Sequence, residues 1–170
     1  MDELKYWHAV FTASRAEKKV RDRLEELGVE CFLPVQTVLR QWTYRKSRVV
    51  VPVIAGLMFV RVGRQEQVKV LQTKGVVAFL RLKGEAGAAV IPDKQMEDFR
   101  FLLDFSEEAV EMTNENIKAG DLVRVMKGSL RGMEGELIRH KGVTKVLVRI
   151  DMLGCAMVNI PASFVEKLNK

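Results

Sequence analysis

Short apolar stretches typical of strands recur along this chain, and stretches with helical spacing of apolar residues lie between them. Residues 6–12 are rich in aromatic and β-branched types on both faces, which predicts a strand that is covered on both sides. Apolar residues then recur at helical spacing over residues 16–27, and Gly28 predicts the end of that helix. Ser14 and Glu17 have the spacing of a capping box, which predicts where the helix begins.

The chain up to residue 105 continues this mixture of strands and helices. Pro34 interrupts the next apolar stretch, so we expect an edge strand or an irregular strand there. Strands are predicted at residues 30–39, 49–54, 57–62, 75–82 and 90–92, and helices at residues 65–73 and 93–103. The resulting order β-α-β-β-α-β, with an added helix, predicts an α+β fold in which helices pack on a sheet.

A second pattern follows after a polar interval. Residues 106–116 are acidic with little periodicity, and they are predicted to form a flexible linker. Residues 120–125 then alternate as in a strand, and a tight basic turn with glycines leads into another apolar strand, as in the first hairpin of a small barrel. We therefore predict an N-terminal domain of residues 1–105, the linker, and a C-terminal barrel domain of residues 117–170.

Composition and charge indicate what kind of partner the chain would bind. The chain has 170 residues, 48% of them apolar, which suffices for one large or two small domains, and its formal net charge is +6. Residues 31–65 contain no acid but six cations, so this window alone carries a charge equal to the excess of the whole chain. A polyanionic partner is therefore favoured.

Within that window, residues 40–48 interleave cations with aromatic rings. Cations in such a segment pair with phosphates while the rings stack on exposed bases. An ordinary solvated hairpin is the alternative, and the lack of any offsetting acid favours nucleic-acid contact. The candidate nucleic-acid-binding residues are Arg40, Trp42, Tyr44, Arg45, Lys46 and Arg48.

Several motifs in order resemble the NusG family of transcription elongation factors. They occupy residues 7–12, 17–20, 54–60, 75–80 and 91–92, and a segment similar to a KOW motif follows at residues 120–137. The resemblance covers about the full length. It implies a NusG-type α/β sandwich that a flexible linker joins to an SH3-like KOW β-barrel. The basic segment most resembles specialised paralogues of the RfaH and UpxY kind, which act on long operons such as those for surface polysaccharides.

The sequence departs from the family pattern at two places. Ala55-Gly56-Leu57 stands where the family usually has Pro-Gly-Tyr, and His8 stands where an aromatic residue often follows the first tryptophan. Both departures lie close to the surface that family members use to bind RNA polymerase.

The resemblance implies a transcription elongation and antitermination factor. In family members an apolar concavity on the N-terminal domain receives the clamp helices of the largest polymerase subunit. The positions expected there by alignment are Phe11, Ile54, Phe59, Phe79, Met96 and Phe99. Each of them is alternatively an ordinary core position, because periodicity does not separate a buried face from an interface. The basic segment would contact DNA or nascent RNA.

The C-terminal barrel would bind a ribosomal protein or a termination factor, as the resemblance implies. Its KOW turn comprises Lys127, Gly128, Arg131, Gly132 and Gly135, and the glycines are expected to permit positive φ. Some RfaH-type paralogues hold this domain as a helical hairpin over the polymerase site. Residues 118–170 contain six glycines and seven valines, which favours strands and predicts a barrel that leaves the polymerase surface unmasked.

Other classes find less support in the sequence. The two histidines and two cysteines are scattered, and no nucleophile elbow or phosphate-binding loop occurs, so we expect no metal, cofactor or enzyme activity. No apolar run approaches the ~20 residues of a membrane span, and the first residues lack a secretory pattern, so a cytoplasmic protein without membrane contact is expected. A ribosome-associated KOW protein that binds RNA is the alternative. A nucleic-acid-processing enzyme would need clustered acids or a metal motif.

Overall fold

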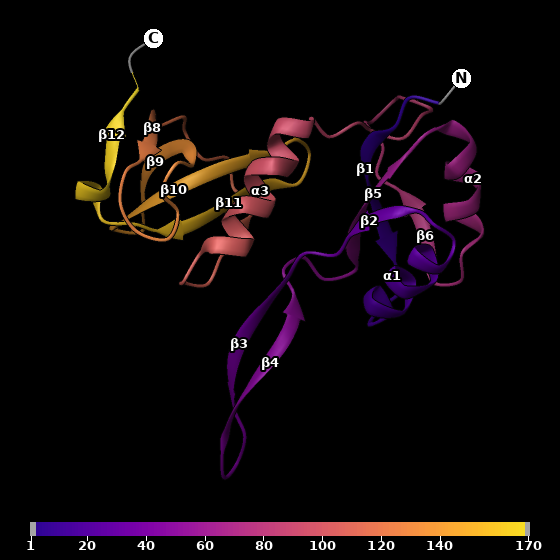
Figure 1. Ribbon diagram of the computed structural model, residues 1–170, viewed down its shortest axis with the longest axis horizontal. Coiled ribbons are helices and arrows are strands. Elements are labelled where there is room, and N and C mark those ends of the chain that lie inside the picture. Colours follow the sequence, from indigo (N-terminus) through magenta and orange to yellow (C-terminus); the bar gives the residue numbers. More distant parts are fainter. Residues whose placement is uncertain (1–2, 169–170) are drawn as a thin grey trace. The chain divides into compact units, whose positions relative to one another are not determined.

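The computed structural model describes residues 3–168 (Figure 1). By its contacts the chain divides into two compact units. The first unit combines the chain up to Pro34 with Ile54–Asp93, and the second combines Val35–Val53 with the chain from Lys94 onward. Strands dominate both units and three α-helices accompany them, so the predicted α+β class is confirmed. None of the helices among the described residues is long and apolar enough to cross a membrane.

The first unit is built on a four-stranded antiparallel sheet in the order β2-β5-β1-β6. Its strands are β1 (Tyr6–Thr12), β2 (Glu30–Phe32), β5 (Leu57–Val62) and β6 (Val76–Phe79). Helix α1 (Glu17–Glu26) contacts β2 and β5, and α2 (Arg64–Gln72) contacts β5 and β6. The middle of β1 is buried on both faces, as the sequence predicts.

The start of α1 differs from the prediction. The N-cap is Ala16 and no side chain caps the helix, so the capping box of Ser14 and Glu17 does not form. The carboxylate of Glu17 is instead buried and accepts a hydrogen bond of 3.5 Å from the backbone N–H of Gly56. A long-range contact has therefore replaced the local cap. After the helix, Gly28 takes the predicted left-handed conformation, with φ of 75°.

Four predicted strands differ from those in the structure. The stretch 30–39 divides before Val35 into β2 and β3 (Val35–Gln41), as Pro34 had suggested. The stretch 49–54 begins earlier, as β4 (Lys46–Pro52), and pairs with β3 in a two-stranded antiparallel hairpin. Strand β6 is shorter than predicted, and the stretch 90–92 contributes only an isolated bridge between Ile91 and Trp7.

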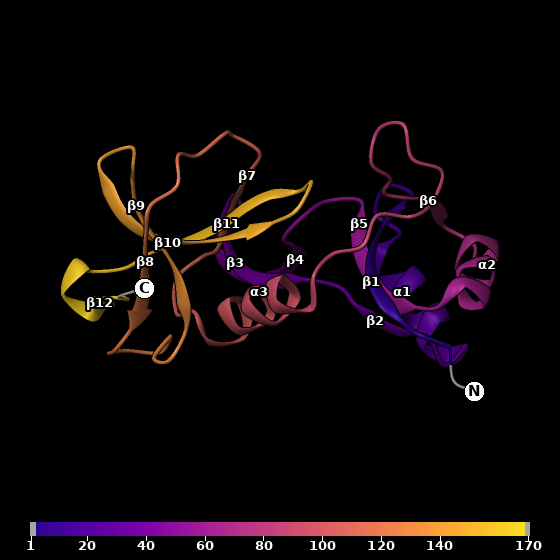
Figure 2. The same cartoon turned by 90° about the horizontal axis from the view of Figure 1, so that it is seen from above.

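The second unit contains, besides this hairpin, a six-stranded antiparallel sheet in the order β12-β8-β9-β10-β11-β7. Its strands are β7 (Glu111–Thr113), β8 (Asp121–Val125), β9 (Glu134–His140), β10 (Val143–Ile150), β11 (Gly154–Asn159) and β12 (Val165–Lys167). A short 3₁₀ turn, Ala162–Phe164, precedes β12. Strands β9, β10 and β11 follow one another side by side (Figure 2). The strands predicted for this segment are confirmed, and closure into a barrel stays a prediction.

Helix α3 (Asp93–Phe105) is grouped with the second unit, although the sequence assigns it to the N-terminal domain. The side chain of Gln95 donates a hydrogen bond of 2.9 Å to Asp151 and accepts one of 2.7 Å from the backbone N–H of Asp151, which follows β10. Strand β7 lies inside the predicted linker and pairs with β11, so these three residues are part of the sheet. Independent folding of residues 1–105 and 117–170 stays a prediction.

An ion pair attaches β7 to the sheet and makes stability depend on pH. The ammonium of Lys145 is buried in β10 and donates to the carboxylate of Glu111, which lowers the pKa of Glu111. We expect Glu111→Gln to lower the free energy of unfolding at pH 7 by about 1 kcal/mol, since a buried cation loses its partner while the exposed carboxylate is screened by solvent.

The lowered pKa of Glu111 sets the direction in which stability changes with pH. The pair stabilises the fold at pH values above 4.5, the ordinary pKa of a glutamate carboxyl group. This stabilisation is lost as the pH falls through the lower pKa of Glu111 in the folded state. Urea unfolding of wild type and Glu111→Gln should therefore differ at pH 7, and the difference should shrink as the pH is lowered below 4.5. Glu107→Gln is the control, because Glu107 is exposed and forms no ion pair among the described residues. Equal stability of all three proteins at pH 7 would refute a role for this pair.

Candidate protein and nucleic-acid interfaces

The β3–β4 hairpin carries all six candidate nucleic-acid-binding residues. Its strands pair from Val35 opposite Pro52 to Gln41 opposite Lys46. At the tip, the backbone N–H of Trp42 donates to the carbonyl of Arg45 over 2.6 Å. The indole N–H of Trp42 also donates to the hydroxyl of Ser47. These contacts give the tip a defined turn.

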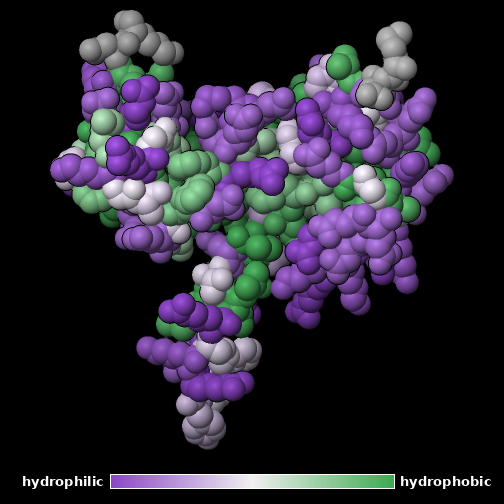
Figure 3. Space-filling model, in the orientation of Figure 1, coloured by the Kyte–Doolittle hydropathy of each residue, from purple (hydrophilic) through white to green (hydrophobic). Residues whose placement is uncertain are grey.

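The tip exposes both rings and its cations. The side chain of Tyr44 is 97% exposed and that of Trp42 is 48% exposed. Arg40, Arg45 and Lys46 are exposed, and no ion pair engages them within residues 3–168. The outer part of the hairpin is mainly hydrophilic, and more hydrophobic residues lie towards its base (Figure 3). Rings and unpaired cations on one narrow turn can stack on bases while they neutralise phosphates.

The apolar candidates of the first unit do not share one face of its sheet. Phe59 lies opposite Ala9 of β1, whereas Phe79 lies opposite Val10, the next residue along the strand. Directly paired residues point to the same side and successive residues to opposite sides, so these two rings lie on opposite faces. Phe59 stacks with Phe32, at 6.2 Å between ring centroids.

Burial further separates the six apolar candidates. Phe59 and Phe79 are buried, and so are Met96 and Phe99 of α3 in the second unit. Four of the six positions therefore have the burial of core residues, the alternative that periodicity left open. Phe11 is 39% exposed and Ile54 is half-buried, which makes them the accessible members of the set.

The KOW turn lies between β8 and β9. Gly128 and Gly132 have φ of 86° and 94°, as predicted. Gly135 lies in β9 without a positive φ, so that part of the prediction is wrong. A Cβ there would lie 2.9 Å from Val146 Cγ2 and 3.0 Å from the carbonyl oxygen of Leu147, so close packing explains this glycine. Lys127 and Arg131 are exposed beside the turn.

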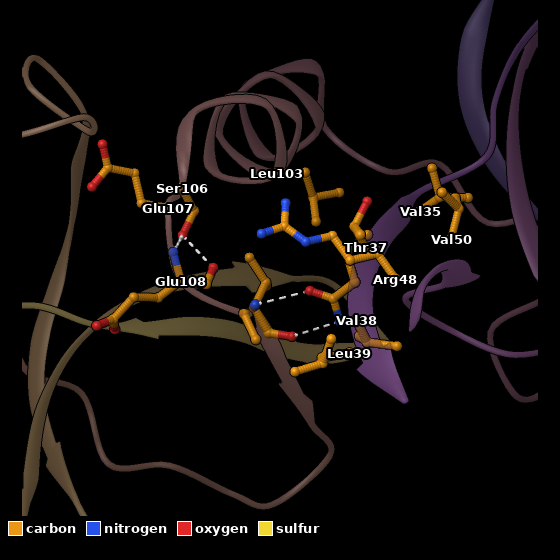
Figure 4. A pocket seen from close by; sticks show the side chains of 13 residues that line it. Val35, Thr37, Val38, Leu39, Arg48, Val50, Leu103, Ser106, Glu107 and Glu108 are labelled. Carbon is orange, nitrogen blue, oxygen red and sulfur yellow. Dashed lines mark hydrogen bonds between the residues drawn. The ribbon is translucent and has the colours of Figure 1, made fainter. Parts of the chain in front are cut away.

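A cleft of about 610 Å³ lies in the second unit and was not predicted (Figure 4). It is lined by residues 35–39 of β3, by Arg48 and Val50 of β4, and by Leu103 and residues 106–110. The sequence shows these positions only as parts of strand, helix and linker patterns. Alternation along β3 could indicate an amphipathic strand. The sequence contains no signal that residues 106–110 line a cleft together with this strand.

Histidine, cysteine and acidic side chains are the groups that could hold a metal ion in the described part of the chain. No group of three His, Cys, Asp or Glu side chains there is arranged to hold a metal ion. Both cysteines are free, Cys155 is buried, and burial raises the pKa of the Cys31 thiol to about 11. That thiol is therefore protonated near neutral pH and a poor nucleophile.

The protein combines an antiparallel α+β unit with a second unit that is rich in strands and carries an exposed basic hairpin. Such surfaces are suited to binding macromolecules. The chain belongs to the NusG family, because the family model described as transcription termination factor nusG matches residues 5–100, more than half of its length. The resemblance seen in the sequence is thus confirmed at the level of the family. Members of this family are transcription factors, not enzymes.

Three solved structures are similar to this chain to different degrees. The structure titled "Domain interaction in Thermotoga maritima NusG" has a TM-score of 0.52 at 23% identity, and the match covers 97% of this chain and 98% of that chain. Two conformations of an MjSpt4:Spt5 complex match at 16% identity with TM-scores of 0.33, covering 96% of this chain and 99% and 97% of those chains. At this identity the Thermotoga match supports the fold alone. No curated protein matches the sequence.

Proposed function

We propose that this chain binds RNA polymerase and acts as a transcription elongation and antitermination factor. The observation that carries the proposal is the exposed hairpin tip of aromatic rings and unpaired cations on a chain of the NusG family. Its long basic hairpin favours a specialised factor of the RfaH or UpxY kind, which would act on particular long operons such as polysaccharide loci. Reduced pausing and termination are its proposed effects.

The first unit is the proposed contact for the clamp helices of the largest polymerase subunit. Phe11 and Ile54 are the accessible apolar residues of the candidate set, and an aromatic ring gives a large contact area at an interface. Phe59, which lies on the same face of the sheet as Phe11, would support this surface from the core, whereas Phe79 lies on the other face. Binding at the clamp would keep the enzyme closed on its template.

The other two surfaces receive different partners in this proposal. The hairpin tip contacts exposed DNA or nascent RNA of the elongation complex, with Arg45 and Lys46 on phosphates and the rings on bases. The C-terminal sheet, as a KOW domain, recruits a ribosomal protein or a termination factor through exposed residues such as Lys127 and Arg131 of its turn.

Co-purification tests the proposal. An affinity-tagged full-length chain should retain polymerase subunits from a nuclease-treated lysate, since the proposed clamp contact joins protein to protein. Nuclease treatment removes nucleic acid that would otherwise bridge unrelated proteins. Ribosomal subunits recovered without polymerase would contradict the proposal and support the ribosome-associated alternative.

A further inference from the structure

Among residues 3–168, no strand lies beside one edge of strand β3. Within this part of the chain β3 pairs with β4 alone, in the two-stranded hairpin sheet. The backbone hydrogen bond at the tip makes Trp42 and Arg45 a hydrogen-bonded pair, and such pairs alternate with non-hydrogen-bonded pairs along an antiparallel ladder. The non-hydrogen-bonded positions of β3 are then Val35, Thr37, Leu39 and Gln41. Their N–H and C=O groups point away from β4, towards the open edge.

Pro52 supports this assignment. It lies opposite Val35, at a position where the strand residue points its N–H outward. Proline has no N–H, so an outward position is where a strand tolerates it. The hairpin therefore loses no internal hydrogen bond at Pro52.

The open edge of β3 borders the cleft. Five consecutive residues of β3 line it, and residues 106–110 form the opposite wall. At one end, the side-chain amide of Gln36 donates to the carbonyl of Val110 over 3.2 Å and accepts from its N–H over 3.0 Å, as a neighbouring strand would. Beyond the hydrogen bonds between Gln36 and Val110, the outward backbone groups of Thr37 and Leu39 pair with no strand among the described residues.

The side chains add an apolar surface and one cation. Leu39 is 62% exposed and Val50 is 48% exposed, and Leu103 lies across from them. The guanidinium of Arg48 extends into the cleft, and the carboxylates of Glu107 and Glu108 point away from it (Figure 4). Nothing in residues 3–168 forms an ion pair with Arg48.

We propose that this cleft binds an extended peptide of a partner protein, which adds to β3 as a third strand. Outward N–H and C=O groups alternate along β3, and a peptide backbone provides the complementary acceptors and donors. Aliphatic side chains of the peptide pack on Leu39, Val50 and Leu103, and a carboxylate pairs with Arg48. A nucleic-acid backbone offers acceptors to Arg48 but no matching row of donors. The site shares Arg48 with the candidate nucleic-acid-binding set, but it lies apart from the rings and cations of the hairpin tip and from the proposed polymerase contacts.

Peptide selection with the full-length protein tests the chemistry. The probe is an immobilised library of seven-residue peptides with Val, Ile or Leu at alternate positions and Glu, Gln or Lys at the centre. Central Glu should bind roughly tenfold more tightly than Gln, since a charge-assisted hydrogen bond is lost with the amide. Arg48→Gln should remove this preference and leave binding of the Gln peptides unchanged.

A backbone variant tests the strand addition itself. Thr37→Pro removes an outward N–H while the hairpin keeps its internal bonds, so peptide affinity should fall roughly tenfold or more as an acceptor of the peptide is left unpaired. Lys46→Pro is the matched control: Lys46 pairs with Gln41, so its N–H also points outward, but along β4 and outside the cleft. It should bind peptide as wild type does, while the loss of its ammonium affects only the proposed nucleic-acid contact at the tip. Circular dichroism verifies that both variants fold.

Three results would overturn the proposal. The first is that wild type binds no peptide at millimolar concentration, and the second is that it binds the Glu and Lys peptides equally. The third is that a folded Thr37→Pro variant binds peptide with wild-type affinity. If a single-stranded oligonucleotide binds wild type and is lost in Thr37→Pro instead, the cleft belongs to nucleic acid. Recovery of polymerase with the tagged protein is measured separately, so failure here leaves the proposed function intact.

Discussion

Phe11→Glu is expected to weaken binding of the full-length protein to RNA polymerase by at least roughly thirtyfold, the effect of losing an anchor worth about 2 kcal/mol. Phe11 is the most accessible ring among the proposed polymerase contacts, at 39% exposed. A carboxylate at that position would have to be desolvated against an apolar partner surface. Titration of fluorescently labelled protein with core polymerase measures the change.

Tyr6→Glu is the matched control for this variant. Tyr6 lies on the same strand, is 46% exposed, and points to the opposite face of the sheet, because five positions separate it from Phe11. It should bind polymerase normally. Phe59→Glu is not a useful probe, since a carboxylate at this fully buried position would unfold the domain. A folded Phe11→Glu variant with normal affinity would remove Phe11 from the site.

The sequence predicted those parts of the fold that depend on local patterns. Aromatic and β-branched content located β1, an apolar run located β5, and Gly28 marked the end of α1. Each of these signals arises within a few residues. The capping box was wrong for the opposite reason. Glu17 satisfies a backbone N–H far away in sequence, at Gly56, and no local pattern contains that contact.

The candidate site was predictable in its composition and less so in its geometry. Interleaved rings and cations without acids identified the hairpin tip, and the structure exposes them together. The apolar set was harder, because alternation shows that successive residues differ in face but does not show which partner each strand has. Only the register places Phe59 and Phe79 on opposite sides of the sheet. The cleft beside β3 also depends on register and on a distant segment, so the sequence held no signal for it.

Replacing Arg40, Arg45 and Lys46 together by glutamine is expected to weaken binding to a paused elongation complex and to flatten its dependence on salt. Each phosphate contact releases slightly less than one counterion, so the slope of log K against log salt should become shallower by roughly 2 to 3. The triple leaves Arg48 in place, so the peptide cleft is not altered. Affinity measured at several salt concentrations gives the slope.

The control keeps the same change in net charge at other positions. Lys83, Lys118 and Lys141 are exposed and lie outside the hairpin, so their replacement by glutamine should leave the slope unchanged if binding is local to the tip. An equal loss of slope in both triples would instead indicate attraction by net charge alone. An unchanged slope in the hairpin triple would assign the tip to solvent.

The aromatic residues of the tip should show a different effect. Trp42→Ala with Tyr44→Ala is expected to reduce affinity by about 1–3 kcal/mol for each base that no longer stacks, with the salt slope unchanged because no phosphate contact is removed. Trp42→Ala removes the indole contact to the Ser47 hydroxyl. The hairpin should still remain folded, since the backbone bond between Trp42 and Arg45 does not depend on a side chain. If this double variant flattens the slope as the cation triple does, stacking and charge are not separable at the tip, and the assignment of rings to bases is wrong.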